Sequence, residues 1–173
     1  MKLSEGDVAL SDRIIGIIRQ LSPYSKATNA PQWDPKEILA EARRILNLHS
    51  HYQDYYYQME GAGHAFDDLL TSLEGMFQIC SKIEIIQSLQ GLTEMVAKDL
   101  DDIMNGCDEG MPWQFVGERL GKYWLQLSCR EDLVGADRSS ILSFISKLIP
   151  KFASYGLDQP FYPAMKILER GAT

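Results

Sequence analysis

The sequence predicts an all-α, single-domain bundle of six or seven helices with no sheet. Apolar residues recur at alternating steps of three and four in five segments, which is the spacing of a helix face. No proline occurs between Lys36 and Met111, and no stretch alternates apolar and polar residues over the length of a strand. The 173 residues amount to about one domain, which we expect to span 1–173.

The first expected helix covers residues 7–21. It ends where Ser22 precedes Pro23, because a proline disfavours helical geometry in the residue before it. Residues 22–33 follow as a loop that is rich in Ser, Thr, Asn and Pro.

The second helix has a clear start signal. Asp34 is a good N-cap, Pro35 suits the first helical position, and Glu37 follows in the first turn. From Ile38 to Cys80 an apolar seam then continues at heptad steps, the pattern of helices that pack at shallow angles.

The length of this seam requires a break. One helix over 34–80 would be roughly 70 Å long, whereas a compact chain of this size has a radius of gyration of about 16 Å. Glycine costs about 1 kcal/mol in a helix interior, so Gly61-Ala62-Gly63 is the expected break. We therefore predict helices at 34–60 and 63–79, with the unbroken rod as the alternative.

Four more helices follow from the same periodicity. The first covers 81–104 and ends at Asn105-Gly106, a common C-terminal signal. The others are expected over 112–127, from Asp137 or Ser139 to Ile149, and over 160–169.

Composition narrows the class of protein. The chain is 45% hydrophobic and 24% charged, which is typical of a globular protein. It has 17 Lys and Arg against 24 Asp and Glu, a net charge of −7, which argues against binding duplex nucleic acid. The first residues lack the apolar core of a signal peptide, and no apolar run has the length of a membrane span. Cys80, Cys107 and Cys129 form no C-x-x-C pair and are expected as reduced thiols, so we expect a cytoplasmic protein.

Two clusters of acidic residues and histidine are candidate metal sites. Glu60, His64 and Asp68 share one helix face but lack a matching ligand pair elsewhere in the sequence. A second group around the end of the 81–104 helix lacks the oxygen ligands and glycine that a calcium loop requires. Its members are Asp99, Asp101, Asp102, Asp108 and Glu109. We expect solvated polar surfaces at both places, with no bound metal and no cofactor.

An enzymatic alternative rests on Arg44-Ile-Leu-Asn-Leu-His49. This segment resembles the R-x4-6-H motif of HEPN domains, an all-helical family that includes metal-independent RNases. The resemblance implies that His49 acts as a general acid or base and that Arg44 binds the transferring phosphate.

A third alternative rests on three spaced patterns. Met59-x3-Gly63-x2-Phe66 resembles the BH3 spacing of the Bcl-2 family. Glu109-Gly110-x2-Trp113-x2-Val116 and Leu148-x-Pro150-x5-Gly156-x4-Phe161 resemble parts of its BH1 and BH2 segments. The resemblance implies a regulator that binds a partner in a groove.

The feature that decides our prediction is a cluster of tyrosines. Tyr52, Tyr55, Tyr56 and Tyr57 occur within six residues of the helix expected over 34–60. Successive residues on a helix point in different directions, so one core cannot bury all four, and surplus tyrosine is typical of a contact surface. We predict a non-catalytic interaction module, an adaptor or regulator, that binds another protein or a second copy of itself as a homodimer through these tyrosines.

Overall fold

The computed structural model describes residues 12–13, 15–17, 33–51, 56–105 and 115–171, with side chains for all of these except 49–51, 56–60 and 105. These residues form helices and no strand, which confirms the all-α prediction. The helices are α2 (Pro35–His51), α3 (Tyr56–Ile79), α4 (Lys82–Asn105), α5 (Val116–Ser128), α6 (Gly135–Ala153), the short 3-10 helix η2 (Gln159–Phe161) and α7 (Tyr162–Gly171).

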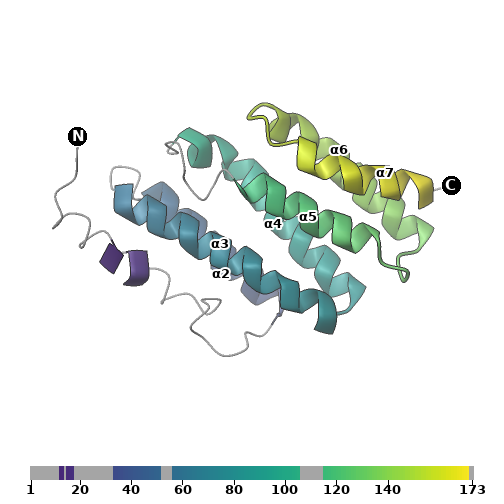
Figure 1. Cartoon of the computed structure of the whole chain (residues 1–173), viewed down its shortest axis with the longest axis horizontal. Coiled ribbons are helices and arrows are strands. Elements are labelled where there is room, and N and C mark those ends of the chain that lie inside the picture. Colours follow the sequence, from purple (N-terminus) through teal and green to yellow (C-terminus); the bar gives the residue numbers. More distant parts are fainter. Residues whose placement is uncertain (1–11, 14, 18–32, 52–55, 106–114, 172–173) are drawn as a thin grey trace.

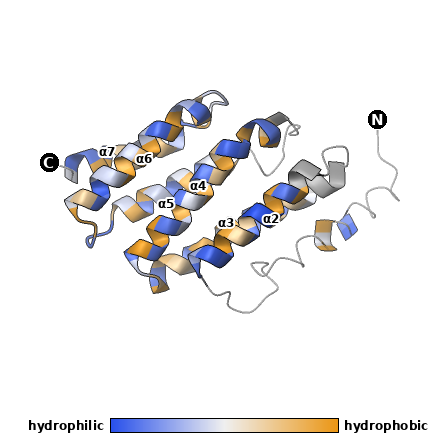
Figure 2. Cartoon of the chain, turned by 180° about the vertical axis from the view of Figure 1, so that it is seen from behind, coloured by the Kyte–Doolittle hydropathy of each residue, from blue (hydrophilic) through white to orange (hydrophobic). Residues whose placement is uncertain are grey.

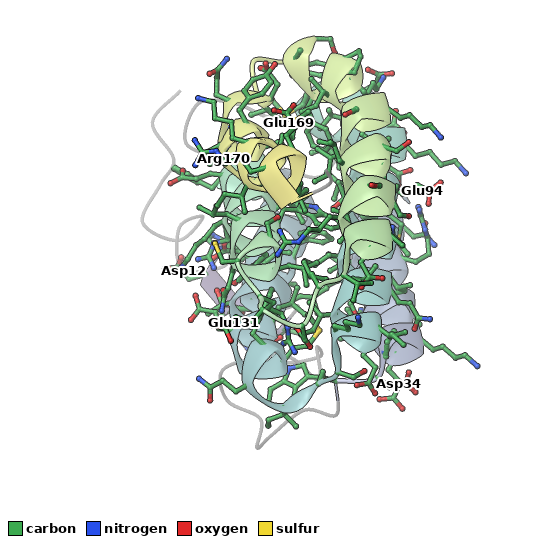
Figure 3. The ribbon with its side chains drawn as sticks, turned by 90° about the vertical axis from the view of Figure 1, so that its right-hand side faces the viewer. Asp12, Asp34, Glu94, Glu131, Glu169 and Arg170 are labelled. Atoms are coloured by element: carbon green, nitrogen blue, oxygen red, sulfur yellow. The ribbon has the colours of Figure 1, made fainter. Side chains whose placement is uncertain are left out.

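The helices stack as three antiparallel pairs, α2 with α3, α4 with α5, and α6 with α7 (Figure 1). Each helix also packs against the next but one, so α2, α4 and α6 form one layer and α3, α5 and α7 the other. The end-on view in Figure 3 shows these layers as two columns. Each helix thus buries apolar residues against the other helix of its pair and against the neighbouring pair.

The start of α2 agrees with the prediction. Asp34 caps the helix, because its Oδ1 accepts a hydrogen bond of 3.0 Å from the backbone N–H of Lys36. Of the helix expected over 7–21, the described residues 12–13 and 15–17 are helical, and the remainder lies outside the described part of the chain.

The predicted break at 61–63 is wrong. α2 ends at His51 and α3 runs from Tyr56 through Gly61-Ala62-Gly63 without interruption. The rod over 34–80 is also wrong, because α2 and α3 lie side by side (Figure 1). Gly61, Ala62 and Gly63 are all buried, so the packing of small residues outweighs the low helix propensity of glycine.

The later boundaries differ in smaller ways. α4 and α7 lie within two residues of their predicted ranges, whereas α5 begins at Val116 instead of residue 112, and residues 112–114 lie outside the described chain. α6 continues past Pro150 to Ala153, because Phe152 is buried and its ring lies 4.8 Å from that of Phe161. Tertiary packing therefore stabilises a last turn that proline alone would disfavour.

One hydrophobic core runs through the stack, and the helices carry both hydrophobic and hydrophilic residues along their length (Figure 2). The largest fully buried side chains are Trp124, Tyr123, Phe66, Phe152 and Phe161. α5 contributes eight buried residues, including Gly117 and Gly121. A Cβ atom on Gly121 would lie within 2.6 Å of the Pro160 backbone carbon, so glycine permits the close approach of η2.

Candidate functional site

A groove separates α3 from α5 in the layer that also holds α7. α5 packs closely against α7 but only sparsely against α3, and the space between α3 and α5 has a volume of about 780 Å³. The α3 wall is lined by His64, Asp67, Thr71 and Glu74. The α5 wall is lined by Phe115, Glu118, Arg119, Lys122 and Tyr123. The α3 residues recur at steps of three and four, and the α5 residues lie at 115, at 118 and 119, and at 122 and 123, so each set lies on one helix face.

Two ion pairs cross the groove and hold its walls together. Arg119 Nε lies 3.0 Å from Asp67 Oδ1, and Arg119 Nη1 donates to Thr71 Oγ1 at 2.7 Å. Thr71 Oγ1 donates in turn to the Asp67 carbonyl. One turn further along, Lys122 Nζ lies 3.3 Å from Glu74 Oε1, with both side chains more than half exposed. The two cations are thereby neutralised across the groove.

The charge that remains in the groove is acidic. Its walls carry three carboxylates, Asp67, Glu74 and Glu118, against the two cations. Glu118 is exposed, and no ion pair joins it to another side chain in the described residues.

The floor of the groove is apolar and fixed in place. The Tyr123 hydroxyl donates a hydrogen bond to the Leu70 carbonyl on α3, and the Tyr123 ring stacks on Phe77 with the ring centres 5.7 Å apart. Burial raises the pKa of Tyr123 to about 12, with a smaller contribution from Glu74, so the hydroxyl stays a donor at neutral pH. By contrast, Phe115 at the start of α5 is 54% exposed.

The helix expected over 34–60, on which the prediction places the four tyrosines, is not continuous. α2 ends at His51, Tyr56 and Tyr57 open α3, and Tyr52 and Tyr55 lie outside the described residues. The prediction of one helix that carries all four tyrosines is therefore wrong. The contact role of Tyr52, Tyr55, Tyr56 and Tyr57 stays a prediction.

Arg44 of the enzymatic alternative has a partner within its own helix. Its Nε and Nη2 donate to the two carboxylate oxygens of Glu41, at 2.9 and 2.6 Å. The hydrogen bond to Glu41 raises the pKa of Arg44, and the pair compensates the guanidinium charge. His49 lies on the same helix, with its side chain outside the described set.

Two of the three candidate metal ligands on α3 have described side chains. His64 lines the groove, Asp68 is buried, both have interactions of their own, and the side chain of Glu60 is not among those described. In the described part of the chain no three His, Cys, Asp or Glu residues form a metal-binding group.

The acidic residues at the end of α4 connect helices. Asp99 pairs with Arg43 of α2 at 2.7 Å. Asp101 pairs with Lys151 of α6 at 2.6 Å and accepts a hydrogen bond from the Tyr155 hydroxyl. The hydrogen bond from Lys151 is the largest cause of a lowered pKa at Asp101. Asp102 is exposed, and Asp108 and Glu109 lie outside the described residues.

The segments of the groove-binding alternative are only partly described. Gly63 and Phe66 lie within α3, Val116 begins α5, and Trp113 is outside the described chain.

Among the described residues, no helix is long and apolar enough to cross a membrane.

The chain matches no protein-family model, and no curated protein or solved structure is significantly similar to it. The geometry of the α3/α5 groove is therefore the basis for assigning a candidate function.

Sequence reasoning did not single out this groove. Its only signal is the charged run Glu118, Arg119 and Lys122 in a helix that otherwise supplies core residues. The opening itself depends on the separation of α3 from α5, which heptad spacing does not encode.

Proposed function

We propose that the protein is a non-catalytic protein–protein interaction module, an adaptor or regulator that acts in the cytoplasm. The observation that carries this proposal is the α3/α5 groove with the exposed ring of Phe115 beside it. An exposed aromatic residue next to a concave surface is a common anchor for a protein partner.

The interactions that join the two walls of the groove favour binding. The Arg119–Asp67 and Lys122–Glu74 pairs and the Tyr123 hydrogen bond connect α3 to α5, so the groove exists before a partner arrives. A preformed surface loses little conformational entropy on binding. Stacked helix pairs also present extended surfaces that repeat proteins commonly use for binding.

We keep two further hypotheses beside the groove, the tyrosine cluster and the RNase motif. Tyr52, Tyr55, Tyr56 and Tyr57 are a second contact surface, for a partner or for a second copy in a homodimer. The RNase alternative requires Arg44 to face a phosphate, whereas its Nε and Nη2 are both bonded to Glu41. Cleavage of RNA that survives EDTA and is lost in His49→Ala would favour that alternative.

The proposal is tested by affinity purification from the native host with three baits: the wild type, Phe115→Ser and Val134→Ser. Val134 is 56% exposed and precedes α6, whereas Phe115 precedes α5, which is about 20 Å long and ends at Ser128, so Val134 controls for loss of any exposed apolar residue. We expect a protein that is retained by the wild type and by Val134→Ser and lost with Phe115→Ser. Identical sets of bound proteins for all three baits would contradict the groove as the functional site.

A further inference from the structure

We infer that the occupant of the α3/α5 groove is a short amphipathic α-helix of a partner protein that carries apolar anchor residues and at least one Lys or Arg. This inference rests on the proposed function, since it names the class of partner for the same site.

The groove matches a few turns of helix. Its α3 wall extends from His64 to Glu74 and its α5 wall from Phe115 to Tyr123. At about 1.5 Å per residue these walls are roughly 15 and 12 Å long. Such a length accommodates two to three helical turns, or about eight to ten residues of a helical guest, which would lie over the ion pairs that join the two walls.

The walls favour a helical guest over an extended one. Both walls are α-helices, so their backbone groups are bonded within α3 and α5 and are not free to pair with a strand. An extended peptide would leave backbone N–H and C=O groups unpaired where it is buried, at a cost of about 1–3 kcal/mol each. A helix satisfies its own backbone and needs to present only side chains, which is the helix-in-groove mode of recognition.

The apolar contact is supplied by Phe115. The Phe115 side chain is 54% exposed, whereas Tyr123, which also lines the groove, is only 1% exposed and leaves little ring surface for a guest. Apolar guest residues spaced by three or four, on one helix face, would cover the Phe115 ring.

The charge of the groove selects a basic guest. Asp67 and Glu74 are already paired with Arg119 and Lys122, which leaves Glu118 as an exposed carboxylate without an ion-pair partner among the described residues. The whole chain carries −7, so a basic segment is attracted at long range and an acidic segment is repelled. A guest Lys or Arg facing Glu118 completes the charge pattern.

The test uses a display library of random peptides about 14 residues long, which is roughly 20 Å as a helix. The library is selected against the full chain, and the best peptides are then measured by fluorescence anisotropy and circular dichroism. We expect peptides with apolar residues at steps of three or four and a positive net charge, helical when bound, whose affinity falls at least tenfold with Phe115→Ser.

Glu118→Lys tests the charge argument directly. It should weaken a selected peptide by roughly three- to tenfold, in line with the loss of one exposed ion pair and the gain of one repulsion, and a Lys→Glu peptide should recover the loss. Glu94→Lys makes the same change on α4 in the other layer, where Figure 3 shows Glu94 pointing away from the stack, and should leave affinity unchanged.

The possible failures separate the two proposals. Phe115-dependent peptides that are acidic, or that bind in an extended form, would overturn the basic-helix inference while supporting the groove as an interaction site. Peptides that are insensitive to Phe115→Ser, or no peptides at all, would overturn both. Circular dichroism of each variant confirms that a lost affinity does not reflect unfolding.

Discussion

Gly121→Ala tests how closely α5 packs against η2. Gly121 is buried on the side of α5 that faces η2. An added Cβ would meet the carbonyl oxygen of Pro160, with the Pro160 Cβ and backbone carbon at 2.5 and 2.6 Å. Ordinary contacts of this kind begin at 3.4 Å, so the Pro160 backbone must move by about 1 Å to relieve the closest contact, which is to its carbonyl oxygen.

The size of the effect follows from two opposed terms. Pro160 cannot rotate away, because the clash involves its backbone, and Phe161 beside it is buried against Phe152. Overpacking of this kind costs up to about 3 kcal/mol. The higher helix propensity of alanine returns about 1 kcal/mol. The net loss of about 2 kcal/mol corresponds to a Tm that is lower by about 4–8 °C for a chain of this length.

Thermal melts followed by circular dichroism measure this directly, with Gly135→Ala as the matched control. Gly135 opens α6, and a Cβ there meets nothing within 4 Å, so the same chemical change should leave Tm equal or slightly higher. A Gly121→Ala protein that melts at or above the wild-type temperature would refute the close packing of η2 on α5.

Three further predictions concern a buried hydroxyl, an ion pair and the tyrosine surface. Ser88 is fully buried and its Oγ has no hydrogen-bond partner among the described residues, so Ser88→Ala should raise the unfolding free energy by about 1 kcal/mol in urea melts; a loss of stability would contradict this. Asp137 accepts from Lys82 Nζ at 2.8 Å and from the Val134 N–H, and the Lys82 hydrogen bond is the main reason that its pKa lies below the ordinary value. The stabilisation by Asp137 is therefore present at neutral pH and is lost as the pH falls through the lowered pKa. Asp137→Asn should accordingly lower Tm at pH 7 by more than at pH 3. A difference in Tm between wild type and variant that is the same at both pH values would contradict this. Tyr57→Ala should change stability by less than about 0.5 kcal/mol and weaken self-association in analytical ultracentrifugation, and a wild-type monomer at high concentration would rule out the homodimer.

The parts of the fold that sequence predicted well are those that depend on local chemistry. Asp34 and Pro35 mark the start of α2 because capping and the proline φ angle act within a few residues. In the described part of the chain, heptad spacing correctly indicates helices, since each helix of the stack buries an apolar stripe.

The errors arose where tertiary packing outweighs propensity. Gly61 and Gly63 lie inside α3 because they are buried, and α6 passes Pro150 because Phe152 packs against Phe161. The groove was missed for a related reason, since Arg119 and Asp67 are 52 residues apart in the sequence and meet only when α3 and α5 are stacked.

The most direct measurement is site-specific photo-crosslinking in the native host, with benzoylphenylalanine in place of Phe115 or of Val134. Both positions are more than half exposed, but only Phe115 lines the α3/α5 groove. An interaction module that uses this groove should give one dominant protein adduct from position 115, absent from position 134 and displaced by the basic helical peptides selected above. No adduct at position 115, or the same adducts from both positions, would contradict the groove as the binding site.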